Sequence, residues 1–284
     1  QFISSLLIAC TRARKDSTLH IKNPETLVSK PYILATLAVL SWFGFRAEAL
    51  ESIDHEFTAF RIAGDQKVRG KKGFPVPGDM SSGASLVCAV LAARGEISLS
   101  NAGDEHFPQS DSAVVPLARK FGGALTKKGD RLSVSANRKV SPERFDLDLG
   151  DSPDLVPPMV GVSAATGSQV KIMNIGHLRF KESDRIETLA REMRKMGASI
   201  KEDRTSIEIL SSKPSEQKEF RKPILLDPEK DHRMLIAFTI AGLSGKFGEI
   251  AIKDPDCVKK SYPDFVSDLQ RLCHEKKTIR IAEL

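Results

Sequence analysis

The sequence predicts a mixed α/β (α+β) protein built from repeated βαβαββ units that are divided between two domains. Three observations support this fold class. Four successive segments of about 75 residues share one order of helical, strand-like and polar stretches. In each segment, runs with helical periodicity alternate with short runs rich in β-branched residues. A Gly- and Pro-containing stretch at 70–79 separates the first unit from the other three. We therefore predict an incomplete first domain at 1–76 and a second domain at 77–284.

The first unit opens on an apolar helix and ends on a predicted strand pair. The helix "QFISSLLIAC" places its apolar residues on one face. These residues are Phe2, Ile3, Leu6, Leu7 and Cys10. The strand pair lies in "FGFRAEAL" and "FTAFRIA". Since the helix begins at residue 1, we expect the chain to be an N-terminally truncated piece of a longer protein.

The three later units repeat this order. Their first helices open at Asp79, Asp154 and Asp231, and each helix leads into a strand: "EISLS", "QVKIMN" and "EIAIKD". A hairpin is predicted to turn at Gly129 and Asp130 in "LTKKGDRLSV". The third of these units ends in "LCHEKKTIRIAEL", and "SSKPSEQKEFRKP" (211–223) is predicted to be a polar loop within the second domain.

The helix in "RIETLAREMRKMGA" is the strongest amphipathic signal in the chain. Its apolar residues recur with helical spacing, and Gly197 is a typical C-terminal stop. The apolar stripe comprises Ile186, Leu189, Ala190, Met193 and Met196. We expect the opposite, polar face to be solvated.

Composition narrows the class of function. The 284 residues are 40% hydrophobic and 28% charged, which is typical of a soluble globular enzyme. The formal charge of +6 favours anionic partners. Aromatic residues make up only 6% and do not alternate with basic ones, which argues against a nucleic-acid partner. No apolar run reaches 18 residues, so we expect no membrane span.

The four cysteines indicate a reducing compartment. Cys10, Cys88, Cys257 and Cys273 form no C-x-x-C pair, so neither structural zinc nor a disulfide framework is predicted. Cys10 and Cys88 lie in apolar helical runs and are expected to be buried thiols. We predict a cytoplasmic protein without a metal site.

Polar residues recur at two places in each unit. One is the residue that opens the first helix. The other is the loop after the first strand, "LVSKPY", "DEHFPQSD", "HLRFKESDR" and "CVKKSYPD" in turn. Helix N-termini favour anions, so both places would line an anion-binding cavity. The helix-opening residues are Gln1, Asp79, Asp154 and Asp231.

The polar residues of these loops offer cations for phosphate or carboxylate and carboxylates for proton transfer. Each also has an ordinary interpretation. Asp154 and Asp231 could be N-caps, and Lys181 and Arg185 could be solvated surface residues. Glu182 fits the acidic first turn of a helix. The recurrence of cations at matching positions in successive units favours a site.

Five motifs, in this order, resemble the family of 5-enolpyruvylshikimate-3-phosphate (EPSP) synthases: "LVSKPY", "PGDMSSGAS", "PDLVPP", "LRFKESDRI" and "DHRM". The resemblance extends to about Leu272. It implies the enolpyruvate transferase fold, with three such units in each of two domains. It also implies transfer of the carboxyvinyl group of phosphoenolpyruvate to the 5-hydroxyl of shikimate 3-phosphate, with release of phosphate, in aromatic amino-acid biosynthesis. The family needs no metal or organic cofactor, and we expect a monomer in the full-length form.

The resemblance also implies roles for individual residues. Asp154 matches the base for the 5-hydroxyl, Glu182 the acid for the methylene carbon, and Lys181 the catalytic cation beside both substrates. The implied ligands of phosphoenolpyruvate are Gln1, Arg185, Arg233 and Lys260. The implied ligands of shikimate 3-phosphate are Gln1, Ser29, Tyr32, Asp154, His177 and Lys181. His177 stands where the family often has Asn, and Phe180 is a departure that we expect to affect only packing.

Two alternatives stay open. A related enolpyruvyl transferase acts on a UDP-sugar (UDP-N-acetylglucosamine), but it lacks the K-E-S-D-R and D-H-R pair in this form and relies on a loop cysteine, for which only Cys257 is a candidate. A second alternative is a non-catalytic binding remnant. Four of six expected units are present, so we expect the 284-residue chain by itself to be inactive.

Overall fold

The computed structural model describes residues 1–67, 73–102, 107–136, 144–212 and 223–272. The chain divides into two compact units. Unit 1 comprises Gln1–Gly78 and Gly103–Ser110, and unit 2 comprises Asp79–Ala102 and Asp111–Leu284. The predicted division lies at 76/77, and unit 1 ends its first segment at Gly78. Gly103–Ser110 falls within the predicted second domain, 77–284, but belongs to unit 1.

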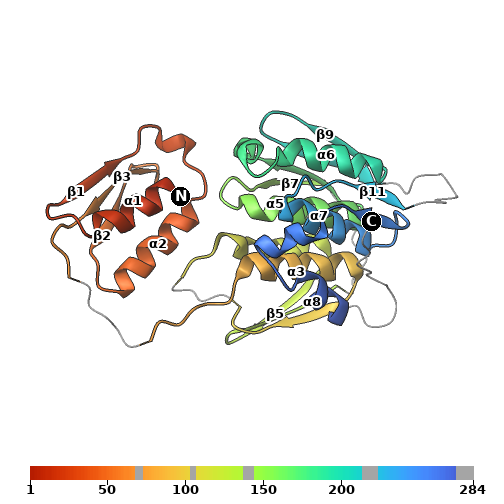
Figure 1. Ribbon diagram of the computed structural model, residues 1–284, viewed down its shortest axis with the longest axis horizontal. Helices are drawn as coiled ribbons and strands as arrows, with labels where there is room; N and C mark the ends of the chain where they lie inside the picture. The colour runs from red at the N-terminus through yellow and green to blue at the C-terminus, as the bar shows by residue number, and fades with distance from the viewer. Residues whose placement is uncertain (68–72, 103–106, 137–143, 213–222, 273–284) are drawn as a thin grey trace. The chain divides into compact units, whose positions relative to one another are not determined.

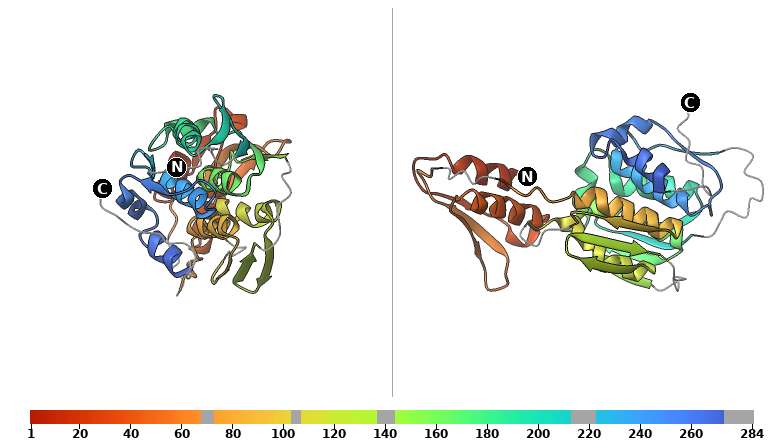
Figure 2. Two further views of the ribbon diagram at one scale, coloured as in Figure 1. Left: turned by 90° about the vertical axis from the view of Figure 1, so that its right-hand side faces the viewer. Right: turned by 90° about the horizontal axis from the view of Figure 1, so that it is seen from below.

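The described residues of unit 1 form two α-helices, a short 3₁₀ helix and a three-stranded antiparallel sheet. Its elements are α1 (Phe2–Cys10), β1 (Ser17–His20), η1 (Pro24–Thr26), α2 (Lys30–Trp42), β2 (Ala47–Glu51) and β3 (Phe57–Ile62). The sheet order is β1-β3-β2, and α1 and α2 lie side by side on one of its faces (Figure 1). The right-hand view of Figure 2 shows both helices again, in red and orange.

The predicted apolar face of α1 is only partly correct. Leu7 is fully buried, and Ile3 and Cys10 pack against the same small core. Phe2 and Leu6 are 88% and 48% exposed, because the core of unit 1 reaches only one side of the helix. Cys10 is therefore half-buried and not the buried thiol that we predicted.

The first part of unit 2 repeats the same order. Its elements are α3 (Met80–Ala93), β4 (Glu96–Leu99), η2 (Ser110–Ala113), α4 (Val114–Ala118), η3 (Arg119–Phe121), β5 (Ala124–Lys128) and β6 (Arg131–Ser135), and the first residue of η2 still belongs to unit 1. The sheet order is β4-β6-β5, and both pairs are antiparallel. The predicted hairpin turn is confirmed, with Gly129 at φ 58° between β5 and β6. Cys88 of α3 is buried, as predicted.

The second part carries most of the polar motifs. Its elements are β7 (Arg144–Asp148), η4 (Pro153–Leu155), α5 (Val156–Thr166), β8 (Gln169–Met173), η5 (Gly176–Phe180), α6 (Arg185–Lys195), β9 (Ala198–Glu202) and β10 (Ile207–Ser212). The sheet order is β7-β8-β10-β9, with β7 parallel to β8 and the other pairs antiparallel.

The third part is shorter within the described residues. Its elements are β11 (Ile224–Leu226), α7 (His232–Leu243), β12 (Ile250–Ile252), η6 (Pro255–Lys260) and α8 (Phe265–Leu272). Strands β11 and β12 pair in parallel. Most of the predicted polar loop at 211–223, and nearly all of "LCHEKKTIRIAEL" with Cys273, fall outside the described residues.

The first helices of the three repeats form the centre of unit 2. Helices α3, α5 and α7 pack on one another and are buried along almost their whole length (Figure 1). Gly161 of α5 allows the closest approach, because a Cβ there would lie 2.6 Å from the carbonyl oxygen of Ala237 on α7. The N-terminal ends of these helices carry Asp79, Asp154 and Asp231, so this core determines where the polar residues lie.

Helix α6 confirms one prediction and corrects another. All five residues of the predicted apolar stripe have no exposed surface. The polar face is not simply solvated, however, because Thr188 and Glu192 are 1% and 0% exposed. Among the described residues, no helix is long and apolar enough to cross a membrane.

Candidate active site

A fully buried ion pair links the starts of two helices of unit 2. Arg185 is the first residue of α6 and is 1% exposed, while Asp231 is the N-cap of α7 and has no exposed surface. Arg185 Nε donates to Asp231 Oδ2 at 2.8 Å. Asp231 also accepts from the Arg233 backbone N–H at 2.9 Å and from Ser183 Oγ at 3.1 Å. Asp231 is therefore an N-cap, as its sequence position suggested, and also the buried counter-ion of Arg185.

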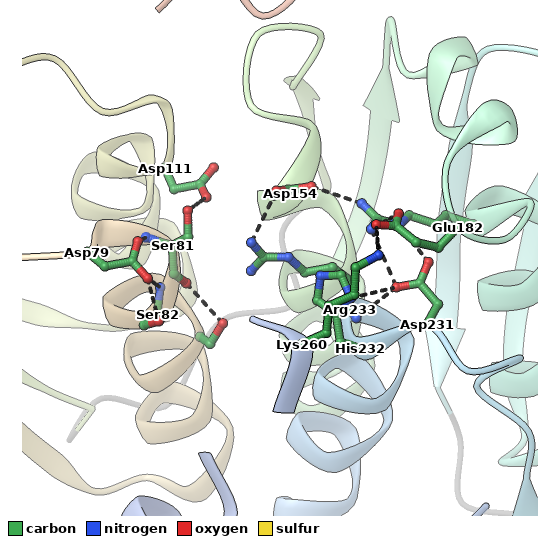
Figure 3. A network of polar contacts seen from close by, with 12 residues as sticks. Asp79, Ser81, Ser82, Asp111, Asp154, Glu182, Asp231, His232, Arg233 and Lys260 are labelled. Carbon is green, nitrogen blue, oxygen red and sulfur yellow. Dashed lines mark hydrogen bonds and ion pairs between the residues drawn. The ribbon is translucent and has the colours of Figure 1, made fainter. Parts of the chain in front are cut away.

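Asp154 does not act as the N-cap that its position at a helix start suggested. It lies in η4 and points toward two guanidinium groups (Figure 3). Arg185 Nη1 donates to its Oδ1 at 2.9 Å, and Arg233 Nη2 donates to its Oδ2 at 3.1 Å. Burial would raise the pKa of Asp154, but the charges of Arg233, Arg185 and Lys181 outweigh burial and lower it. The carboxylate is therefore ionised at neutral pH.

Glu182 is the second carboxylate of this network. Arg185 Nη2 donates to its Oε2 at 2.9 Å, and Lys260 Nζ donates to its Oε1 at 2.7 Å. Burial opposes ionisation, but the hydrogen bond from Lys260, the backbone N–H and the charge of Arg185 prevail and lower the pKa of Glu182 to about 2. Without a ligand, Glu182 is a carboxylate and not an acid.

One guanidinium thus holds three carboxylates together. Arg185 contacts Asp154, Glu182 and Asp231, and Arg233 and Lys260 extend the network at its two ends. Figure 3 shows the members of this network that it labels lying together: Asp154, Glu182, Asp231, Arg233 and Lys260. We call the network of Asp154, Glu182, Arg185, Asp231, Arg233 and Lys260 the arginine hub. Because the hub is crowded with charge but partly open at Asp154, Glu182 and Lys260, it can exchange internal partners for an anionic ligand.

Three buried nitrogens near the arginine hub lack a hydrogen-bond partner among the described residues. One is His232 Nδ1, which lies 3.8 Å from Asp231 Oδ1. The other two, Arg233 Nε and His177 Nε2, belong to predicted ligands. His177 lies in η5, where burial and the nearby charge of Lys181 lower its pKa, while Asp151 and Asp154 act in the opposite direction. Buried donors are normally satisfied, so Arg233 Nε and His177 Nε2 are candidates to meet a ligand. Lys181 itself is exposed.

A second polar cluster lies at the start of α3. Asp79 caps this helix and accepts from the backbone N–H groups of Ser81 and Ser82. Ser81 Oγ donates to Asp111 Oδ2 at 2.5 Å (Figure 3). Burial raises the pKa of Asp111 against the opposing effects of Ser81 and Arg233. Asp79 is therefore an ordinary cap, unlike Asp154 at the equivalent place.

The remaining predicted residues belong to unit 1. Gln1 is the N-cap of α1 and is exposed. Ser29 is the N-cap of α2 with a left-handed backbone (φ 63°), which a non-glycine residue adopts only at a cost. Tyr32 lies in the first turn of α2 and is 40% exposed. In unit 2, Phe180 is 87% exposed, so the expectation that it would affect only packing is not met within the described residues.

Sequence reasoning missed two members of this site. Asp231 was noted as a helix-opening residue but not as the partner of Arg185, and Ser183 was not singled out. The position of Asp231 directly before His232 and Arg233 was a signal that it pairs with a cation, because a helix N-cap and a cation on the first turn lie close together. Ser183 had no signal beyond its position between Glu182 and Asp184.

The comparisons with known proteins agree with one another. The model of one family, described as EPSP synthase (3-phosphoshikimate 1-carboxyvinyltransferase), matches residues 1–269. The 3-phosphoshikimate 1-carboxyvinyltransferase of Nitrosopumilus maritimus is 32% identical over 272 residues, which cover 96% of this chain and 60% of that protein. The one of Pyrococcus abyssi is 34% identical over 275 residues, covering 97% and 60%. The chain thus spans about 60% of the length of these relatives.

Solved structures share the fold. An EPSP synthase from Acinetobacter baumannii matches with a TM-score of 0.71 at 20% identity, over 94% of this chain and 59% of that chain. The enolpyruvyl transferase NikO from Streptomyces tendae matches with a TM-score of 0.63 at 17% identity, over 95% and 58%. The predicted fold class is confirmed.

Proposed function

This chain belongs to the EPSP synthase family, and on that premise we propose that the protein transfers the carboxyvinyl group of phosphoenolpyruvate to the 5-hydroxyl of shikimate 3-phosphate and releases phosphate. The observation that carries the proposal is the arginine hub. Two carboxylates able to move protons, Asp154 and Glu182, share one buried arginine with two further cations beside them. This is the charge pattern that a reaction between two phosphorylated substrates requires.

The reaction is an addition followed by an elimination. In the addition, the 5-oxygen of shikimate 3-phosphate bonds to C2 of phosphoenolpyruvate, loses its proton, and C3 gains one. In the elimination, the bond from C2 to the phosphate oxygen breaks while a proton leaves C3. We assign the hydroxyl proton to Asp154, since its lowered pKa keeps it ionised and its contacts with Arg185 and Arg233 fix its direction.

Glu182 is proposed as the acid for C3, and this role needs a change of protonation. Its pKa is held at about 2 by Lys260 and Arg185. When the carboxylate and phosphate of phosphoenolpyruvate engage these cations, Glu182 loses its partners and gains negative neighbours, and both changes raise its pKa. Substrate binding thus converts Glu182 from a counter-ion into an acid, and after donating its proton it can take one back from C3.

The cations are assigned to the phosphoenolpyruvate anion. Arg185, Arg233 and Lys260 are its proposed ligands in unit 2, and the unpartnered Nε of Arg233 supports this assignment. Lys181 is proposed to assist both substrates as a catalytic cation, because its charge acts on Asp154. The unpartnered Nε2 of His177 supports a contact with shikimate 3-phosphate.

Unit 1 contributes three proposed ligands. Gln1 is proposed to contact both substrates, and Ser29 and Tyr32 to contact shikimate 3-phosphate. The left-handed backbone of Ser29 is the kind of local strain that occurs at ligand sites, which supports its role. We further propose that the enzyme works in the cytoplasm, as a monomer, without metal or organic cofactor.

The experiment measures phosphate release from shikimate 3-phosphate plus phosphoenolpyruvate by the protein at the full length that its gene encodes. Asp154→Asn and Glu182→Gln are each expected to lower kcat by about 10²–10⁴-fold, with much smaller effects on substrate affinity. Arg61→Met, at an exposed ion pair of unit 1, is the control. Absence of turnover in the wild-type protein, with binding of both substrates retained, would instead support a non-catalytic binding protein.

A further inference from the structure

Helix α6 carries a second stripe of structural side chains besides its apolar one. Thr188, Arg191, Glu192 and Lys195 follow one another at helical spacing and share one face. Glu192 is the buried centre of this stripe, with no exposed surface. Its Oε1 accepts from Arg191 Nε at 2.8 Å and its Oε2 from Lys195 Nζ at 2.6 Å. A buried carboxylate with this many partners is not a solvated surface residue.

The polar stripe holds the turn between β11 and α7. Glu192 Oε2 accepts from the backbone N–H of Asp227 at 2.9 Å. Glu229 Oε1 accepts from Arg191 Nη2 at 2.8 Å, and Glu229 Oε2 from Thr188 Oγ1 at 3.2 Å. Three side chains of α6 therefore contact the segment 227–230, which we call the strained turn.

The strained turn has an unfavourable backbone. Glu229 and Lys230 are consecutive non-glycine residues in the left-handed region, at φ 52° and 58°. Such conformations persist only where surrounding contacts over-determine them. Inside the turn, Asp227 Oδ1 accepts from the Glu229 N–H at 2.9 Å. The other restraints on Asp227 and Glu229 come from the polar stripe and from Lys253.

The strained turn ends at the centre of the arginine hub. The backbone N–H of Asp231 donates to the Pro228 carbonyl oxygen at 2.9 Å, so the position of Asp231 follows from the turn. Asp231 in turn holds Arg185 Nε and the N–H of Arg233. Arg185 starts α6, the same helix that grips the turn, so the contacts form a closed loop. In this loop Glu192 holds the turn, the turn carries Asp231, and Asp231 holds Arg185.

We propose that Glu192 is a positioning residue of the active site, which sets the orientation of Arg185 by clamping the strained turn that carries Asp231. Among the described residues, the hydrogen-bond partners of Glu192 are Arg191, Lys195 and Asp227, and none of them is a member of the arginine hub. Its effect on phosphoenolpyruvate binding passes through the direction of the Arg185 guanidinium. The inference rests on the proposed function only for the identity of the ligand that Arg185 binds.

The first readout needs no substrate. It is the hydrogen-exchange rate of the Arg185 Nε–H in the protein at the full length that its gene encodes, measured by NMR and assigned through its loss in Arg185→Lys. We expect Glu192→Gln to accelerate this exchange about tenfold, as is typical of coupling within one ion-pair network. The affinity for phosphoenolpyruvate, measured by calorimetry, should be lower in Glu192→Gln than in wild type by a similar factor.

The matched control is Arg194→Ala on the same helix. Arg194 binds the Ile200 carbonyl oxygen and Glu202 and contacts no part of the strained turn among the described residues. It should lower thermal stability while leaving the Arg185 exchange rate within about twofold of wild type. If Glu192→Gln behaves like this control, Glu192 has only a structural role. If Glu192→Gln does not fold, Arg191→Met is the second variant, because it leaves the Glu192 carboxylate bound to Lys195 and Asp227. It should accelerate the exchange of the Arg185 Nε–H, but by less than Glu192→Gln. No acceleration in Arg191→Met would overturn the proposal.

The two readouts separate this inference from the proposed function. Faster Arg185 exchange in a chain that binds no phosphoenolpyruvate supports the clamp and contradicts the ligand assignment. Unchanged exchange in a chain that does bind phosphoenolpyruvate contradicts the clamp alone.

Discussion

The buried pair of Arg185 and Asp231 makes a sharp prediction about stability. We consider Arg185→Met, which keeps a long apolar stem and removes the guanidinium. Asp154 would keep Arg233 as a partner and Glu182 would keep Lys260. Asp231, with no exposed surface, would keep hydrogen bonds from a hydroxyl and a backbone N–H, and His232 Nδ1 would remain 3.8 Å from its Oδ1. Burial lowers the pKa of His232, which disfavours the charged imidazole that could compensate Asp231. The loss therefore falls mainly on one buried, uncompensated carboxylate.

We expect this substitution to lower the free energy of unfolding by about 3–5 kcal/mol at neutral pH, the usual cost of breaking a buried ion pair on one side. Adding Asp231→Asn in the same chain removes the uncompensated charge and should recover about 1–3 kcal/mol. The measurement is urea unfolding followed by far-UV circular dichroism. Arg61→Met, whose ion pair with Glu48 is more than half exposed, should cost no more than about 1 kcal/mol. A cost for Arg185→Met equal to that of Arg61→Met, or a double variant no more stable than the single one, would refute the reasoning.

Three further predictions concern titration and packing. The pKa of Glu182 lies below its ordinary value of 4.5. The stabilisation that its ion pairs provide is therefore complete above about pH 4.5 and is lost as the pH falls toward 2. In acid unfolding, the stability of Glu182→Gln should depend less steeply on pH across this interval than that of wild type. Phosphoenolpyruvate binding at about pH 5 should take up more protons in wild type than in Glu182→Gln. Calorimetry in two buffers of different ionisation enthalpy measures this proton uptake. Equal uptake by the two proteins would contradict the proposed protonation of Glu182 on substrate binding. Gly161→Ala should lower stability by about 1–3 kcal/mol, because its Cβ would meet a backbone oxygen of α7 at 2.6 Å. The same change at Gly83, whose Cβ would make only ordinary contacts, should be neutral or stabilising by up to about 1 kcal/mol in thermal unfolding.

The repeat made much of the fold predictable. The apolar stripe of α6 and the hairpin at Gly129 follow from short-range periodicity and turn chemistry, which act within a few residues. The burial of Glu192 could not be predicted in the same way. Its helical spacing places it on a polar face, and its contact with the strained turn comes from Asp227, 35 residues further along the chain.

The same limit applies to the candidate site. Asp79 and Asp154 open equivalent helices, yet Asp79 caps its helix while Asp154 binds arginines. The difference is set by Arg185 and Arg233, which lie 31 and 79 residues away from Asp154 in the chain. A sequence motif indicates which residues are available for ion pairing, but which carboxylate takes which cation depends on how α5, α6 and α7 pack.

The aromatic residues give the two units separate optical signatures. The chain has a single tryptophan, Trp42, and it lies in unit 1, where Phe74 and Phe107 pack against its ring. The two tyrosines are divided, with Tyr32 in unit 1 and Tyr262 in unit 2. Indole emission therefore originates in unit 1, with no label added. The arginine hub in unit 2 contains no tryptophan, so a change in the emission of Trp42 reports on the surroundings of this one side chain.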